Sequence, residues 1–298
     1  MKQFIKNNLM SIILFLILLS IGLYSTFKYI NWYNNYEKIV IRNIQECKNS
    51  NIEEQIINCE DIIELSNEKM QSDYFYMTNE IMRDYSKITY ILFLFISLPI
   101  LYEICKIFKN KQLLYELTRE NYSKFKNKII RNSYIKSMIL PLSVLIIQII
   151  ILIYCNGFTT NVYFKDGIMI DNIINPYLYF VTIIIRLIII SIIYTNIALI
   201  VARKKHDFYI ATILSYLLFI GIEFILEFLI GVILFDNLFK MNSMELYINI
   251  INVFNLNLGK GYMLLYLPLI VVLIISSIIL YFEYRNKEKL ILDCEKNN

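Results

Sequence analysis

Six long apolar blocks constrain this chain of 298 residues more than any other feature of its sequence. About 20 helical residues, at about 1.5 Å each, cross a hydrocarbon core of about 30 Å, and these blocks reach that length with few charges. Backbone groups in lipid are satisfied only inside helices or closed barrels, and barrel strands are about 10 residues long with alternating character. The sequence therefore predicts an all-α, polytopic membrane protein whose six transmembrane helices cover residues 9–30, 88–108, 138–155, 177–202, 208–235 and 263–284.

Composition agrees with this class and excludes others. Hydrophobic residues make up 57% of the chain and charged residues 18%, against about 45–50% and about 25% in soluble domains. One histidine and five scattered cysteines are too few for a His-rich metal site, and neither G-x-x-x-x-G-K-[ST] nor G-x-G-x-x-G occurs. We expect no catalytic residues, no metal, no cofactor and no nucleic-acid partner, so any nucleotide chemistry must come from a partner protein.

The distribution of lysine and arginine predicts the orientation in the membrane. The connection between the second and third blocks is strongly basic, and the turn before the fifth block carries Arg203, Lys204 and Lys205, whereas the other two loops carry one or two cations each. The positive-inside bias therefore predicts a multi-pass protein of the cell membrane with both termini in the cytoplasm. Lys2 and Lys6 also suit a signal peptide, but the apolar stretch continues to Trp32, which favours an uncleaved span.

The sequence divides into a few regions around these spans. Apolar residues recur at helical spacing in the acidic insertion, as at Ile52, Ile56 and Ile63, which predicts a small helical extracytoplasmic cap. Cys47 and Cys59 lie in this insertion and are either a disulfide or two inert small hydrophobic residues. The predicted regions are a first transmembrane helix (1–31), the insertion (32–87), a five-helix transmembrane region (88–284) with a cytoplasmic loop (109–136) and an outer re-entrant-like segment (236–262), and a cytoplasmic tail (285–298).

The cytoplasmic loop has two interpretations. Apolar and aromatic residues alternate with its cations, so the segment would lie on anionic lipid headgroups. Its first half also predicts a short mixed-charge helix over residues 112–122 that projects toward a soluble partner, and both interpretations can hold for different halves. The candidate partner-binding residues of this coupling segment are Gln112, Glu116, Arg119, Glu120 and Tyr122.

Three charges interrupt the apolar blocks. Arg186 lies in the fourth, and Glu223 and Glu227 lie four residues apart on one face of the fifth. Counted along antiparallel helices, Arg186 and Glu227 reach the same depth, which predicts a buried ion pair; a place in a transport pathway or proton relay is the alternative. Gln148 and Asn196 are predicted to form hydrogen bonds between helices.

This layout resembles the permease subunits of type-2 ABC exporters. The resemblance rests on six spans with both ends inside, the outer insertion, the basic loop after the second span and the tail Tyr281-Phe-Glu-Tyr-Arg-Asn-Lys287, and it covers nearly the whole chain. It implies a second permease subunit, a cytoplasmic ABC ATPase docked on the segment after the second span, and export of an amphipathic peptide or lipid-like molecule. It also implies a gate near residues 236–262.

Two other classes remain as alternatives. A membrane protein that senses, confers immunity or scaffolds a complex would also suit the outer insertion. An intramembrane enzyme would need His, Glu or Asp clustered near a membrane face, but His206 stands alone in its basic turn. An ATPase subunit that accompanies the chain would distinguish an exporter from both of these alternatives.

Overall fold

The computed structural model describes residues 2–48, 89–109, 112–156, 176–240, 262–288 and 291, and every regular element in them is a helix. This confirms the all-α prediction. The helices are α1 (Lys2–Lys48), α3 (Thr89–Lys109), α4 (Gln112–Arg119), α5 (Tyr122–Asn156), α6 (Pro176–Lys204), α7 (Phe208–Phe224), the π-helix η1 (Ile225–Leu238) and α9 (Tyr262–Glu283).

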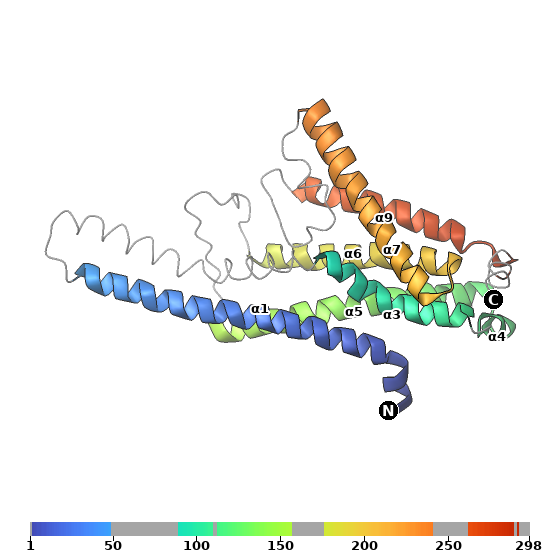
Figure 1. Cartoon of the computed structure of the whole chain (residues 1–298), viewed down its shortest axis with the longest axis horizontal. Helices are drawn as coiled ribbons and strands as arrows, with labels where there is room; N and C mark the ends of the chain where they lie inside the picture. Colours follow the sequence, from blue (N-terminus) through green and yellow to red (C-terminus); the bar gives the residue numbers. More distant parts are fainter. Residues whose placement is uncertain are drawn as a thin grey trace.

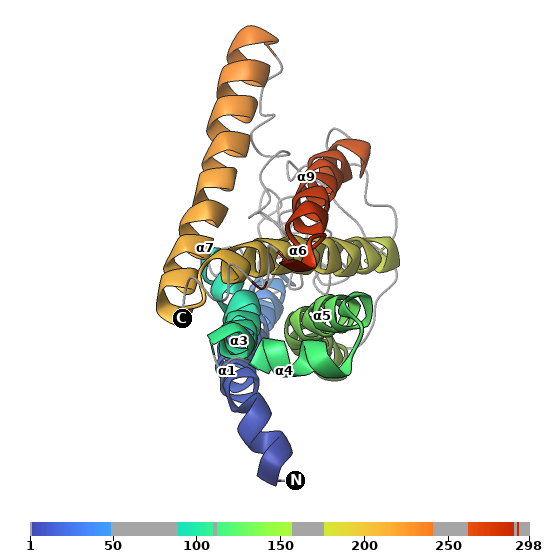
Figure 2. The same ribbon diagram turned by 90° about the vertical axis from the view of Figure 1, so that its right-hand side faces the viewer.

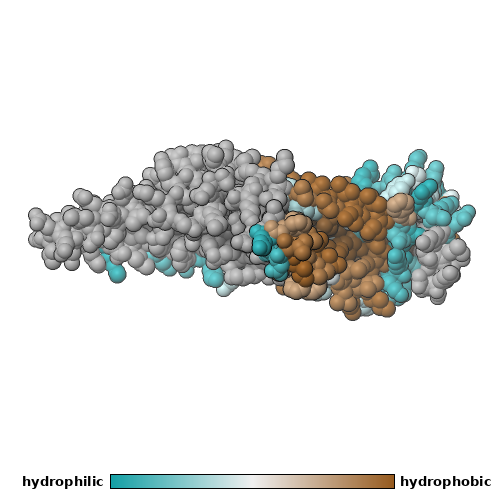
Figure 3. All heavy atoms as spheres, turned by 90° about the horizontal axis from the view of Figure 1, so that it is seen from above, coloured by the Kyte–Doolittle hydropathy of each residue, from teal (hydrophilic) through white to brown (hydrophobic). Residues whose placement is uncertain are grey.

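Six helical stretches within these residues are long and apolar enough to cross a membrane, as the sequence predicts. They are Leu9–Lys28, Ile91–Lys109, Tyr122–Ile151, Val181–Lys204, Phe208–Leu238 and Tyr266–Glu283. Seen from above, the described surface shows an apolar belt that ends at a hydrophilic rim, at the end of the bundle that carries α4 (Figure 3). The belt has the character of a lipid-facing surface, so the chain is a multi-pass membrane protein.

Helix α6 forms the centre of the bundle, with α3, α5, α7 and α9 packed around it, and α1 lies along α5 (Figures 1 and 2). The main apolar core joins α6 to its neighbours through side chains such as Phe93, Leu145, Leu187 and Phe219. Phe93 and Phe219 stack with their ring centroids 4.7 Å apart. The α7–η1 pair leans out of the bundle and leaves most of its surface uncovered (Figure 2).

The first helix extends beyond its predicted end. The predicted boundary lies between residues 31 and 32, but α1 continues without a break to Lys48, so residues 32–48 of the predicted insertion prolong the first span. No Pro or Gly occurs between Leu23 and Lys48 to end the helix. The insertion beyond this point, the Cys59 position and the Cys47 side chain lie outside what the structure describes, so the cap and the disulfide stay predictions.

The predicted cytoplasmic loop divides in two. Its first half is α4, whereas its second half from Tyr122 onward is already the start of α5, a single helix that continues to Asn156. The charged turns of α5 contain no Pro or Gly before Pro141, so no sequence signal separates them from the apolar part of the span. Periodicity alone does not distinguish a separate amphipathic helix from the polar end of a long one.

Helix α7 changes its hydrogen-bonding pattern at Ile225 and continues as the 14-residue π-helix η1. π-helices normally occur as single-turn bulges, which makes this length unusual. The helix ends near Lys240, whose φ of 53° is a left-handed conformation, as is common just after a helix. Only the start of the predicted re-entrant segment, up to residue 240, is described, and it includes the end of η1.

Candidate functional site

Several helix ends meet at one end of the bundle, which we call the charged end. It consists of α4, the last turns of α3, α6 and α9, and the first turns of α5. A second apolar core lies here and includes Phe108, Leu113, Phe125 and Leu280. Leu113, only 1% exposed, and the partly buried Leu117 attach α4 to this core. A short amphipathic helix is thereby held firmly against the spans.

The predicted helix over residues 112–122 ends earlier than expected: α4 stops at Arg119, and Tyr122 already belongs to α5. The residues of the predicted coupling segment therefore have different environments. Arg119 is exposed at the end of α4, whereas Glu120 accepts a hydrogen bond from Lys128 of α5 at 3.2 Å. The side chains of Gln112 and Glu116 lie outside the described set. Glu120 is therefore oriented by α5, and Arg119 is the described member that α4 presents outward.

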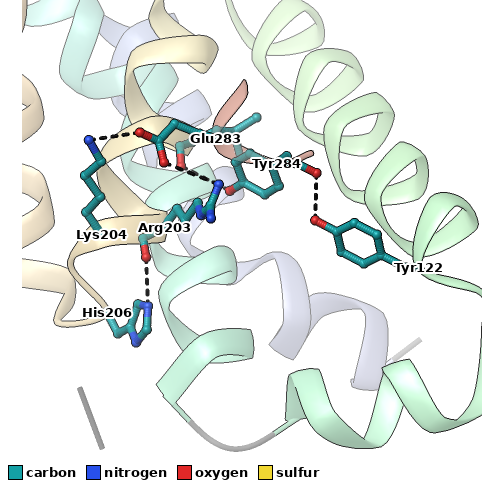
Figure 4. Close-up of polar contacts among 7 residues, drawn as sticks. Tyr122, Arg203, Lys204, His206, Glu283 and Tyr284 are labelled. Carbon is teal, nitrogen blue, oxygen red and sulfur yellow. Dashed lines mark hydrogen bonds and ion pairs between the residues drawn. The ribbon is translucent and has the colours of Figure 1, made fainter. Parts of the chain in front are cut away.

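Tyr122, the last residue of the predicted segment, connects distant parts of the chain. Its hydroxyl donates a 2.7 Å hydrogen bond to the backbone carbonyl of Tyr284, just after α9 (Figure 4). The hydroxyl of Tyr284 in turn donates a 3.1 Å hydrogen bond to the carbonyl of Leu199 in α6. Two tyrosines thus join the start of α5 to the ends of α9 and α6.

An ion-pair network reinforces the same junction. Arg203 at the end of α6 is 1% exposed, and its Nη1 lies 3.3 Å from a carboxylate oxygen of Glu283, whose other oxygen lies 3.0 Å from the Nζ of Lys204 (Figure 4). The Arg203 guanidinium also lies over the ring of Tyr284, 5.6 Å from its centroid. Burying a guanidinium costs free energy unless an opposite charge lies beside it. The Glu283 carboxylate of α9 supplies that charge for Arg203 at the buried end of α6.

His206 closes the turn after α6. Its Nε2 lies 2.9 Å from the carbonyl of Arg203, and because a carbonyl only accepts, Nε2 is the donor (Figure 4). The ring packs against Phe108 of α3, with centroids 5.3 Å apart. The lone histidine of the chain therefore holds a turn, which is a structural role in the described contacts.

Local sequence patterns do not identify this junction as a site. Arg203 and Lys204 stand out in the sequence only as topology signals, and Glu283 and Tyr284 only as part of a family-like tail. The separation between Tyr122 and Tyr284 is 162 residues, so no local pattern reveals the contact. We call Tyr122, Arg203, Lys204, Glu283 and Tyr284 the junction.

The three intramembrane charges are not all brought together. Arg186 and Glu223 are buried, at 2% and 3% exposed, whereas Glu227 lies half-buried on η1. Between the described residues Arg186 and Glu227 the structure forms no ion pair, because η1 leans away from α6 (Figure 2). Glu223 lies within electrostatic reach of the buried Tyr194 hydroxyl on α6.

Two polar residues within the spans form interhelical hydrogen bonds, as predicted. Gln148 of α5 donates to the carbonyl of Gly22 in α1 at 2.9 Å. Asn196 of α6 accepts from the Tyr134 hydroxyl of α5 at 2.7 Å and donates to Ser276 of α9 at 3.0 Å. These bonds tie α1 to α5, and α6 to both α5 and α9, and they explain why such polar groups lie inside an apolar bundle.

The described residues hold no group of three His, Cys, Asp or Glu side chains that could bind a metal ion. The charged end instead combines an exposed helix with buried, directional contacts to three spans. Such an arrangement is suited to passing movement from a surface helix into the membrane.

Comparisons with known proteins do not identify a family, so the function has to be inferred from these residues. No protein-family model matches the sequence, and neither a curated protein nor a solved structure shows significant similarity to the chain.

Proposed function

We propose that the chain is the membrane-spanning permease subunit of an ABC exporter, which moves an amphipathic peptide or lipid-like molecule outward. A separate ATPase subunit supplies the energy, a second permease subunit of the same or another kind completes the transporter, and the charged end faces the cytoplasm. The observation that carries the proposal is α4, a short helix between two spans that is anchored in the core and joined to the junction.

The position of α4 suits a docking element. A helix that receives force from a soluble ATPase must be accessible to that partner and tightly coupled to the spans. Leu113 supplies the coupling, Arg119 is accessible, and only Glu120 and Asn121 separate α4 from α5. So short a connection leaves little slack, and a displacement of α4 is carried into the first turn of α5.

The junction supplies the next step. Tyr122 stands at the start of α5 and is hydrogen-bonded to the end of α9, which is ion-paired through Glu283 to the end of α6. These contacts are short and directional, so movement of α5 shifts the ends of α9 and α6 or breaks the contacts. In the proposed cycle, closure of the ATPase subunits moves α4, and the junction distributes that movement over three spans.

The proposal is tested by purifying the tagged full-length chain from its native membrane and identifying stoichiometric partners. We expect an ATPase with a phosphate-binding loop to co-purify, and the charge-swapped variant Glu116→Lys/Arg119→Glu to lose about tenfold or more of it. The matched control Lys124→Glu/Glu288→Lys also swaps one charge of each sign at exposed positions near this end, and it should retain the ATPase. Absence of an ATPase from the wild-type preparation, or equal losses in both variants, contradicts the proposal.

One observation favours the alternative of a non-transporting sensor, immunity or scaffold protein. The first span ends near Lys28, yet α1 continues for 20 residues to Lys48, about 30 Å of helix beyond the apolar stretch. A projecting helix of this length suits contact with an external molecule. A purification in which no ATPase accompanies the chain, while truncation of residues 32–48 releases a stoichiometric partner, would favour this function.

A further inference from the structure

A cavity of about 310 Å³ opens at the charged end, between the last turns of α3 and the turn that joins α6 to α7. Lys106 and Lys109 line it from α3, and His206 and Asp207 line it from the turn. None of the five junction residues lines this cavity, and the functional proposal does not use it. Its volume falls at the lower end of the range of about 300–1,000 Å³ that is typical of ligand sites.

The charges around the cavity favour an anion. The Asp207 carboxylate accepts hydrogen bonds from the backbone N–H groups of Tyr209 and Ile210 at 3.0 and 3.3 Å, and it lies 3.5 Å from the Nζ of Lys109. These contacts hold the pKa of Asp207 below its usual range, so the carboxylate stays ionised, and the neighbouring ammonium of Lys109 offsets its charge. Lys106 is exposed and forms no ion pair with another described residue, which leaves the cavity net positive.

Aromatic side chains place the cavity at the membrane boundary. Tyr102 and Phe208 meet edge to face with centroids 5.8 Å apart, and both line the cavity together with Tyr209. One apolar span ends at Lys109 and another begins at Phe208, and both residues line the cavity, so the cavity lies at the level where these two spans end. Tyrosines gather at this level in membrane proteins because their rings are amphipathic.

An apolar stripe leads away from the cavity along α7. Tyr209, Ile213 and Leu217 are spaced four residues apart on one helical face and are 75%, 63% and 59% exposed. The stripe therefore begins at the cavity wall and runs into the membrane-spanning part of α7. A cationic cavity above an apolar stripe matches a ligand with an anionic head and an aliphatic tail.

We propose that this cavity binds the phosphate headgroup of an anionic phospholipid, with an acyl chain lying along the α7 stripe. The ammonium of Lys106 neutralises the phosphate as a point charge, and Lys109 shares its charge between Asp207 and the lipid. The bound lipid fixes α3 against the start of α7. This inference is independent of any transport activity, because it needs only a membrane around the spans.

The test uses the full-length protein in detergent and native mass spectrometry with added phosphatidylglycerol or phosphatidylcholine. We expect the wild type to prefer phosphatidylglycerol, and Lys106→Gln/Lys109→Gln to weaken that binding by about thirtyfold, as the loss of two lysines near anionic lipid implies. The control Lys124→Gln/Lys287→Gln removes the same charge from exposed positions near the same end. It should bind as the wild type does, and both variants should elute and melt like the folded wild type.

Three results would overturn the proposal. Equal weakening in both variants would show a diffuse attraction to basic residues, and unchanged binding in both would show that the cavity is not used. Millimolar inorganic phosphate that displaces phosphatidylglycerol fully would assign the cavity to a small phosphate ion, whereas retention of the lipid supports the apolar stripe as part of the site. In that case Ile213→Asn, which makes the apolar stripe polar and keeps both lysines, should also weaken phosphatidylglycerol binding.

Discussion

The central helix α6 and the peripheral pair α7–η1 show how differently two apolar spans are used in one bundle. In the most apolar stretch of each, 67% of residues are buried in α6 and only 17% in α7–η1. The buried side chains of α6 nevertheless include Ser191, Thr195 and Asn196, whereas the exposed side chains of α7 are large and apolar. Polar side chains thus occur inside this bundle beside its bulky apolar core, whereas the outer surface along α7 is bulky and apolar.

The physical reason is that lipid is as apolar as leucine. Helices in a membrane therefore associate through close packing and hydrogen bonds, without a hydrophobic effect between them. High hydropathy in a span indicates exposure to lipid as readily as burial. Four experiments test this contrast between α6 and α7–η1, or the polar contacts that hold these helices in place.

The largest effect is expected from one substitution placed in both helices. Leu187→Ala in α6 removes a side chain that is 1% exposed, whereas Leu217→Ala in α7 removes one that is 59% exposed. We expect the first to lower the free energy of unfolding by about 3 kcal/mol through lost packing, and the second to change it by less than about 0.5 kcal/mol. Unfolding by steric trapping in bicelles measures both, and equal effects would show that α7 is covered by a partner.

The next effect concerns the anchor at the end of α6. Glu283→Gln removes the carboxylate beside the buried Arg203, and we expect a loss of about 2 kcal/mol in unfolding free energy, since a buried charge loses compensation. Glu288→Gln is the control, because this carboxylate is exposed. If the two variants unfold alike, groups other than Glu283 compensate Arg203.

A smaller effect is expected from the polar contacts within the membrane. Asn196→Leu breaks the bonds of α6 to Tyr134 and Ser276, and we expect it to lower the unfolding free energy by about 1 kcal/mol, the scale of such bonds in membranes. Thr212→Val in α7 removes only a bond to its own helix, to the carbonyl of Phe208. Thr212→Val should lower the unfolding free energy by only a few tenths of the loss expected for Asn196→Leu. A larger loss would contradict the difference between α6 and α7.

The smallest effect is a pH dependence at the start of α7. The pKa of Asp207 is lowered chiefly by its hydrogen bond from the Ile210 N–H, with further contributions from Tyr209 and Lys109. A lowered pKa in the folded state gives stability that is present above the unfolded value of about 3.9 and is lost as pH falls through the folded value. Asp207→Asn still caps the helix, so its melting temperature should fall less than that of the wild type below about pH 4.

The sequence predicts the features that depend on local pattern. Helical class and six spans follow from the length of the apolar blocks, and α4 follows from the spacing of Leu113, Leu114 and Leu117. The roles of Gln148 and Asn196 also follow, because a polar group inside lipid requires a partner.

The rest depends on distance and register that the sequence does not carry. Depth counting along ideal helices places Arg186 opposite Glu227, but it contains no information on the tilt that takes η1 away from α6. The bond from Tyr122 to Tyr284 joins residues that are far apart in the chain. The continuity of α1 and α5 escapes prediction because polar turns of a long helix look like separate segments.

The unbroken length of α1 makes it a lever. Because no Pro or Gly interrupts residues 23–48, the extension turns rigidly with the span from which it grows. Its arm beyond Lys28 is about 30 Å, so a change of about 10° in the tilt of the span swings the far end through about 5 Å. A small rearrangement of α1 against α5 inside the membrane is thus converted into a displacement outside it large enough for another molecule to sense or to exploit.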